Sequence, residues 1–253
     1  MMRRLSFGLV LVTAFIVAAC GRQVTPNPPG LGAGGALPGY MIVKFDIAGT
    51  FNFSSYGYWT VFNTTGNGLT PLTNAQQTNW KAYSSTLLAG GGGGATFAGV
   101  GQFLKNSNPA IPPALVFVHT TPQLFQYIPN NNGTNTEFQM TFQRSVFIPI
   151  NATPTPVPSP GHTPQPPFSN IWLFNAFTTQ ANIQNQLLFL DSMGAGGATD
   201  TTFVSPQLDI NTCFDQVFYK QQDINPPSDP AAQIVSIEVA NNPSPGPHSS
   251  PCP

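Results

Sequence analysis

The most constraining feature of this sequence is a hydrophobic period of two residues. The longest example is residues 137–150, where the apolar phase consists of Phe138, Met140, Phe142, Val146, Ile148 and Ile150. Alternation of this kind predicts a β-strand with one buried and one solvated face. Arg144 falls in the apolar phase, so either it pairs inside the fold or a β-bulge re-aims it, and a bulge is the commoner solution.

Two shorter segments, 41–47 and 235–239, show the same alternation and predict strands with one wet face. In the second, the side chains expected inside are Val235, Ile237 and Val239. Other segments are apolar on both phases, which is typical of central strands covered on both sides. These are residues 56–63, 115–118, 170–177 and 187–190, with 97–104 and 124–128 as weaker strand candidates.

Loops rich in Asn, Gly, Thr and Pro separate these segments, and those residue types favour turns. No segment keeps a 3.6-residue period over three turns, and residues 73–88 are the best candidate for a short helix. The sequence therefore predicts an all-β fold. We expect an antiparallel β-sandwich with long Pro/Gly-rich loops and at most one or two short helices.

The composition excludes several classes of protein. Only 7 % of the 253 residues are charged, with 8 Lys and Arg against 9 Asp and Glu, whereas a typical soluble domain has about 25 %. So few cations cannot build the basic surface that a nucleic-acid partner requires. Coiled coils also need more Glu and Lys than this chain has. A hydrophobic content of 41 % is nevertheless ample for a packed core.

Residues 1–19 have the organisation of a secretory signal peptide. Two arginines precede an apolar run of 15 residues, Leu5–Ala19, which is too short as a helix to cross a hydrocarbon core of about 30 Å. The run ends in the sequence VAACG and resembles the bacterial lipoprotein signal, in which cleavage exposes a Cys that is then acylated. We therefore expect a lipoprotein carrying fatty acyl chains such as palmitate at Cys20.

Two or three acyl chains hold a protein stably on a membrane, so the expected partner at this end is the lipid bilayer. The residue after the lipidated position is Gly21 and not Asp. In signals of this type, the lack of an Asp at this position implies an outer-membrane or cell-surface location after export. The expected organisation is a signal peptide at 1–19, a flexible tether at 20–39, a single β-sandwich domain at 40–240 with a Pro-rich loop at 151–167, and a Pro-rich tail at 241–253.

Two cysteines remain after Cys20, and thiols tend to pair in an oxidising compartment. A disulfide between Cys213 and Cys252 would hold the tail against the body, with a stabilisation of about 3–4 kcal/mol in the chain-entropy model. Free or intermolecular thiols are the alternative. No metal-ligand spacing of Cys or His is present, so no metal or other cofactor is expected.

Four segments carry a resemblance to a loose group of bacterial lipoproteins whose sandwich is similar to the DOMON and family-9 carbohydrate-binding folds. They are the alternating strand at 41–47, YWTVFNTTG at 58–66, NIWLFNAFTTQ at 170–180 and DPAAQIVSIEVAN at 229–241. The resemblance implies a sandwich and a carbohydrate ligand. Its carbohydrate-binding members hold calcium through acidic residues near such turns, where this chain has Asn63 and Asn67. Its haem-binding members use Met and His ligands, and His119 matches no such spacing.

Few groups suited to catalysis are present. The sequence has no G-x-S-x-G or H-E-x-x-H motif. A glycoside hydrolase would have to assemble its two carboxylates from Asp46, Glu137, Asp191, Asp200, Asp209, Asp215, Asp223, Asp229 and Glu238. A calcium site is a further hypothesis, because three aspartates lie near a Gly-rich segment, namely Asp191, Asp200 and Asp209. Aspartates in turns, however, more often cap backbone groups.

Aromatic rings are the other candidates for function, because a ring face can stack on a sugar while amides bind its hydroxyls. Trp59 and Trp172 lie inside apolar strands and are expected in the core. Tyr56, Tyr58 and Trp80 lie nearer strand ends or loops, and they are the candidate ligand-binding residues. The expected function is a non-enzymatic, membrane-anchored binding or structural module with carbohydrate as the candidate ligand. The alternative is an envelope glycoside hydrolase with convergent carboxylates.

Overall fold

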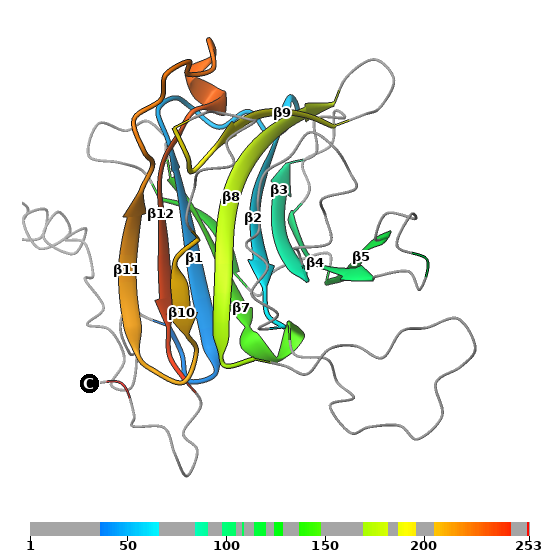
Figure 1. The fold of residues 1–253 in the computed structure, drawn as a ribbon, viewed down its shortest axis with the longest axis vertical. Helices are drawn as coiled ribbons and strands as arrows, with labels where there is room; N and C mark the ends of the chain where they lie inside the picture. Colours follow the sequence, from blue (N-terminus) through cyan, green and yellow to red (C-terminus); the bar gives the residue numbers. More distant parts are fainter. Residues whose placement is uncertain are drawn as a thin grey trace, which may run out of the picture.

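The computed structural model describes residues 36–65, 84–90, 98–104, 108, 114–119, 124–128, 137–147, 169–181, 187–195, 205–243 and 252. Within these residues the chain forms antiparallel strands and short 3₁₀ turns, and the strands make two sheets that pack as a sandwich (Figure 1). The predicted all-β, antiparallel β-sandwich is confirmed. No helix in the described part is long and apolar enough to cross a membrane.

The five-stranded sheet has the order β11-β12-β1-β7-β6. Its strands are β1 (Tyr40–Ile47), β6 (Leu124–Ile128), β7 (Glu137–Gln143), β11 (Phe214–Tyr219) and β12 (Ile234–Asn241). The seven-stranded sheet has the order β10-β8-β2-β3-β4-β5, and β9 pairs with β8 beside β10. Its strands are β2 (Tyr56–Asn63), β3 (Ser85–Gly90), β4 (Ala98–Leu104), β5 (Ala114–His119), β8 (Ile171–Ala181), β9 (Leu187–Ser192) and β10 (Gln207–Asp209).

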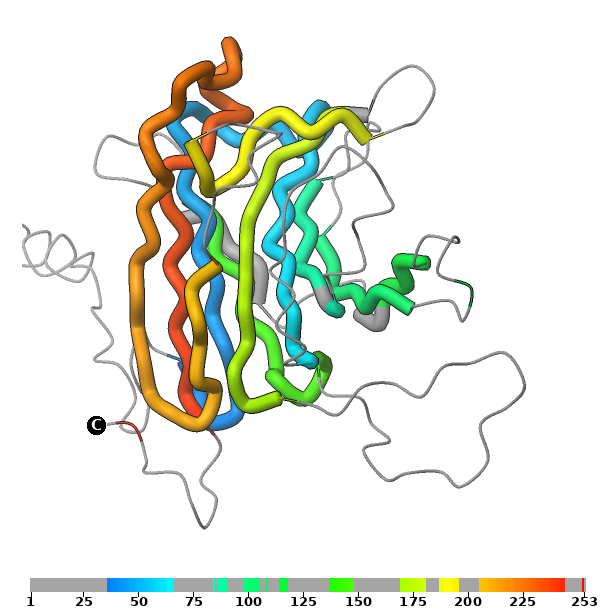
Figure 2. The backbone as a smooth tube through the Cα atoms, in the orientation of Figure 1, coloured from blue at the N-terminus to red at the C-terminus, as the bar shows by residue number. Residues whose placement is uncertain are grey.

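The first and last strands of the described chain lie side by side at the centre of the five-stranded sheet. Val43 on β1 is opposite Val239 on β12 and Met140 on β7, and the blue and red tubes run next to each other in Figure 2. This pairing is non-local, because the strands are far apart in sequence. The sheet therefore forms only when both ends of the domain are present.

The core between the sheets is rich in aromatic rings. Phe45 stacks on Phe138 with ring centroids 5.4 Å apart, and Tyr58 meets Phe45 edge-on at 5.7 Å. Each fully buried side chain of this size contributes about 1.5–3 kcal/mol of hydrophobic stabilisation. The outward face of the seven-stranded sheet is also buried, around Trp59 and Phe177. Burial on both faces confirms that 56–63 and 170–177 form central strands.

Several predicted elements differ in the structure. The predicted strand over 137–150 stops at Gln143, because Arg144–Val146 form the 3₁₀ turn η3 and not a bulge. The Arg144 guanidinium donates a hydrogen bond to the carbonyl oxygen of Ile210, and burial lowers its pKa. The helix expected over 73–88 is wrong at its end, since Ser85–Gly90 is strand β3, and residues 73–83 lie outside the described part.

Two strands predicted as central lie at edges. β5, which contains 115–118, ends the order of the seven-stranded sheet, and Val116 is 43 % exposed. Among the described strands, β9, which contains 187–190, pairs only with β8. An apolar run alone does not distinguish a central strand from an edge strand whose faces are covered by other parts of the protein.

Val235 lies outside although its alternation predicts burial. β1 and β12 change register between Asp46 and Ile47, so that Asp46 is opposite Ser236 and Ile47 is opposite Ile234. Val235 is the extra residue of this bulge and is 38 % exposed, while Ile234 is buried in its place. A bulge shifts the phase by one residue, which a strict period of two cannot anticipate.

The sandwich has two ends, which differ in what holds them. At the terminal end, which contains Tyr40, Asn241 and Phe214, the described chain begins at Ala36 and a disulfide joins Cys213 to Cys252 with Cα atoms 5.5 Å apart. The predicted Cys213–Cys252 pairing is thus present. The opposite end contains Ile47, Tyr56 and Tyr219, and polar side chains hold it together; it is called the braced end below.

Candidate functional site

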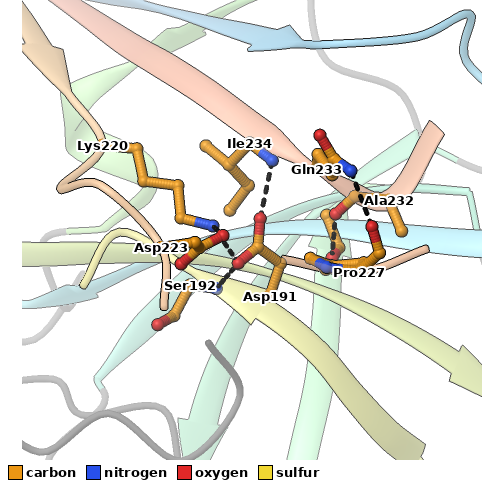
Figure 3. A network of polar contacts seen from close by, with 9 residues as sticks. Asp191, Ser192, Lys220, Asp223, Pro227, Ala232, Gln233 and Ile234 are labelled. Atoms are coloured by element: carbon orange, nitrogen blue, oxygen red, sulfur yellow. Dashed lines mark hydrogen bonds and ion pairs between the residues drawn. The ribbon is translucent and has the colours of Figure 1, made fainter. Parts of the chain in front are cut away.

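A buried ion cluster lies at the braced end. Asp191 on β9 is fully buried, and one of its carboxylate oxygens accepts a 2.8 Å hydrogen bond from the backbone N–H of Ile234. Its other oxygen accepts from Lys220 and from the N–H of Ser192 at 2.9 Å (Figure 3). Lys220 also donates to Asp223, three residues later.

The cluster holds one cation between two carboxylates, and all three side chains are more than nine-tenths buried. Burial raises the pKa of Asp191, while Lys220 and the Ile234 N–H oppose that shift. The second oxygen of Asp223 is buried without a hydrogen-bond partner in the described structure. The cluster connects β9 of the seven-stranded sheet to the β11–β12 connection of the five-stranded sheet. Its geometry therefore suits a structural role in holding the two sheets together.

Hydrogen bonds from tyrosines reinforce this brace. The hydroxyl of Tyr58 donates to the carbonyl oxygen of Ala231 at 2.9 Å, and the hydroxyl of Tyr56 donates to Asp229 at 2.5 Å. Thr178 on β8 donates to the carbonyl of Ala232 at 2.7 Å. The segment 229–232, which precedes β12 of the five-stranded sheet, is therefore hydrogen-bonded to β2 and β8 of the seven-stranded sheet. The hydrogen bond to Asp229 raises the pKa of Tyr56 to about 12 and lowers that of Asp229.

These contacts correct the interpretation of the tyrosines as surface ligand residues. Tyr58 is 1 % exposed and belongs to the core, and Tyr56 is buried as well. Neither ring presents a face on which a sugar could stack. The sequence could not show this, because the hydroxyl partners lie far along the chain. The third candidate, Trp80, and the predicted lipidation site Cys20 lie outside the described residues.

The aspartates of the calcium hypothesis do not converge. Asp209 is opposite Ile171 at one end of β8, whereas Asp191 is opposite Thr178 near the other. Seven strand residues separate these positions by about 23 Å. Asp209 instead accepts the N–H of Asn211 at 2.9 Å and caps a turn. Asp200 is outside the described part, in which no group of three or more His, Cys, Asp or Glu could hold a metal ion.

A second polar group lies on the outer face of the five-stranded sheet. Strand register aligns its side chains in rows across the sheet, of which two are polar along most of their length. One row is Tyr219, Ser236, Asp46 and Glu137, and the next is Val217, Glu238, Lys44 and Gln139. Four of the nine acidic residues of the chain thus gather around Lys44, namely Asp46, Glu137, Asp215 and Glu238.

Electrostatics on this face are dominated by carboxylates. Lys44 forms an ion pair with Glu238 on the neighbouring strand. Burial raises the pKa of Glu137, with Lys44 acting in the opposite direction. Burial also raises the pKa of Asp215, and Glu238, which shares a side-chain hydrogen bond with it, raises it further. A carboxyl group that donates to a neighbouring carboxylate remains protonated to higher pH.

The Asp215–Glu238 pair differs from the arrangement of a glycoside hydrolase. Two carboxyl groups joined by a hydrogen bond have oxygen atoms about 2.5–3.0 Å apart. Retaining hydrolases separate their carboxyls by about 5–5.5 Å, and inverting enzymes by about 6.5–9.5 Å. The pair therefore does not favour the hydrolase alternative.

The open part of this face follows β11, the edge strand of the sheet. Asp215, Gln216, Val217 and Tyr219 are exposed, with Tyr219 at 74 % and Val217 at 44 %. Sequence reasoning missed this strand. The signal was present, since Phe214 and Phe218 share one phase and Val217 and Tyr219 share the other, but apolar residues on both phases mask the alternation.

Comparison of the chain with protein-family models, with curated proteins and with solved structures finds no match in any of the three.

Proposed function

We propose that this chain is a non-enzymatic, lipid-anchored module of the cell envelope that binds its ligand through the outer surface of β11 and β12. The binding surface consists of Asp215, Val217, Tyr219 and Glu238, and is called the β11 surface below. The observation that carries the proposal is the 74 % exposed side chain of Tyr219, which lies beside Ser236 in a row of the sheet that also contains the carboxylates of Asp46 and Glu137.

The anchored location rests on the sequence together with the position of the termini. The expected acyl chains are on Cys20, and Ala36, where the described chain begins, packs against Ile42 and Ala240. The carbonyl oxygen of Ala36 accepts a 2.7 Å hydrogen bond from Asn242. The tether thus arrives at the terminal end, and the β11 surface extends from there to the braced end. A disulfide at the terminal end is consistent with an oxidising compartment.

The chemistry of the β11 surface suits a polyhydroxylated ligand. A phenol ring covers the apolar C–H face of a sugar, while carboxylate and hydroxyl oxygens accept and exchange hydrogen bonds with sugar hydroxyls. The resemblance of the sequence to carbohydrate-binding sandwiches supports the same ligand class. In this proposal Tyr219 takes the role that Tyr56 and Tyr58 cannot fulfil, because their rings are buried.

Glycan-array binding of the mature chain tests the proposal. We expect binding that falls at least tenfold in Tyr219→Ala and is unchanged in Ile224→Ala, a matched control because Ile224 is equally exposed but lies outside the strand. Equal loss in both variants, or a wild-type array without signal, would contradict a carbohydrate ligand. Analysis of the same glycans for cleavage products tests the hydrolase alternative.

A further inference from the structure

Among the described residues, no strand pairs with the outer edge of β11, and the register gives the positions of the backbone groups along this edge. The N–H of Lys220 donates to the carbonyl oxygen of Val235 at 3.0 Å, in line with the β11–β12 register. In an antiparallel pair, hydrogen-bonded positions alternate with positions whose N–H and C=O point away. Phe218, Gln216 and Phe214 are therefore bonded to β12. The backbone groups of Asp215, Val217 and Tyr219 point toward the open edge.

In the part of the chain that the structure describes, this edge has little of the protection that natural sheets use against pairing. Six residues, FDQVFY, form the strand without a Pro, a Gly or a Lys, although these residues, bulges or a covering segment usually blunt an edge. Even Gln216, in the phase that points toward the core, is exposed. Aromatic and β-branched residues in an open edge strand favour addition of another strand.

We infer that β11 pairs antiparallel with β11 of a second copy of this chain, across a twofold axis at Val217. In this register Val217 lies opposite its own copy, and Asp215 lies opposite Tyr219 of the second copy. All three residues with free backbone groups then form hydrogen-bonded pairs. The contact is isologous, since each copy contributes the same surface.

The charges on β11 explain why a second copy fits. Asp215 is the single charged residue of the strand, and it lies off the twofold axis. Each carboxylate is consequently placed beside a neutral phenol and never directly opposite a second carboxylate, which would be destabilising. Val217, at the axis, is 44 % exposed in one copy and would pack beside its equivalent in the pair.

Pairing would join two five-stranded sheets edge to edge with their outer faces on the same side. The two β11 surfaces would then form one continuous surface, and anchoring both copies in one membrane raises their effective concentration. Because pairing uses the strand edge and ligand binding uses the sheet face, this inference does not depend on a carbohydrate ligand.

Disulfide trapping on the acylated, detergent-solubilised chain tests the contact. Val217→Cys should give a covalent dimer on a non-reducing gel, because the Cα atoms of a hydrogen-bonded antiparallel pair are about 5.5 Å apart, within disulfide range. Val116→Cys is the matched control, since Val116 is 43 % exposed on the edge strand of the other sheet. Equal trapping in both variants, or none in Val217→Cys, would overturn the inference.

Light scattering coupled to size exclusion gives an independent measurement. We expect wild type to have twice the mass of one chain and Val217→Pro to be monomeric, because proline removes an N–H that points to the open edge and leaves the β11–β12 bonds in place. A wild-type monomer at every concentration would overturn the inference. If Val217→Pro fails to fold, the trapping experiment still decides. A dimer that binds no glycan would reject the proposed ligand alone.

Discussion

The hydroxyl of Tyr58 donates a 2.9 Å hydrogen bond to the carbonyl oxygen of Ala231, a residue 173 positions later in the chain. The hydroxyl oxygen of Tyr58 also accepts a 3.1 Å hydrogen bond from the backbone N–H of Asn52. One phenol thereby joins the 3₁₀ turn Pro230–Ala232, which precedes β12, to the β1–β2 connection and the central strand β2. A side chain that the sequence presents as a ligand residue is a structural connector.

Tyr58→Phe should lower the free energy of unfolding by about 1–2 kcal/mol, because the buried carbonyl of Ala231 loses its donor and the N–H of Asn52 loses its acceptor. Urea denaturation measures this, with Tyr219→Phe as a control that leaves stability unchanged since its ring is exposed. An unchanged stability of Tyr58→Phe would show that the hydroxyl does not support the brace.

Lys220→Met should destabilise the fold by about 3–5 kcal/mol at neutral pH, because Asp191 and Asp223 would be left as buried carboxylates without a cation. Lys44→Met is the matched control: its pair with Glu238 is more exposed, with 21 % and 19 % of the two side chains accessible, so we expect a smaller loss of stability. The difference between the two variants should shrink on acidification as Asp191 takes up a proton. Equal effects of the two substitutions would contradict the brace.

The Asp215–Glu238 pair makes a pH-dependent contribution to stability. Because the folded-state pKa of Asp215 is raised, the folded state binds its proton more tightly than the unfolded chain does. The contribution of Asp215 to the free energy of unfolding is then largest below its unfolded pKa of about 3.9. This contribution falls as pH rises through the folded pKa of Asp215. Asp215→Asn should remove this fall, and Asp209→Asn should not. Melting temperatures measured from pH 3 to 8 test this, and parallel profiles of wild type and Asp215→Asn would contradict it.

Counting thiols in the denatured, unreduced mature protein tests two expectations together. We expect none, since Cys213 and Cys252 are joined and Cys20 is acylated. One thiol would contradict acylation of Cys20, and two would contradict the disulfide. Reduction should lower the free energy of unfolding by about 3–4 kcal/mol in the chain-entropy model.

The strands that the sequence predicted correctly share strong local signals. β2 coincides with 56–63 because every residue there is apolar or neutral, as burial on both faces requires. β1 was predicted from Met41, Val43 and Phe45, whose alternation survives in the structure. Where the prediction was wrong, a non-local contact decided. Val235 is outside because β12 bulges against β1, and no residue near Val235 in the sequence indicates this bulge.

The candidate site could be predicted even less well. Lys220, Asp191 and Asp223 meet only because β9 and the segment after β11 belong to opposite sheets. The row that aligns Tyr219 with Ser236 depends on the pairing of β11 with β12. Register across strands distant in sequence is set by packing, and no motif encodes it.

By itself, the sequence determined the all-β class, the low content of charged residues, and the cysteines available for a bridge. These follow from periodicity and composition, which are local properties. The tertiary structure alone decided which tyrosine is buried and which is open, which carboxylates share a face, and which strand is left as an edge. Those outcomes depend on contacts between residues far apart in the chain, where the free energy of burying one side chain is set by the strand packed against it.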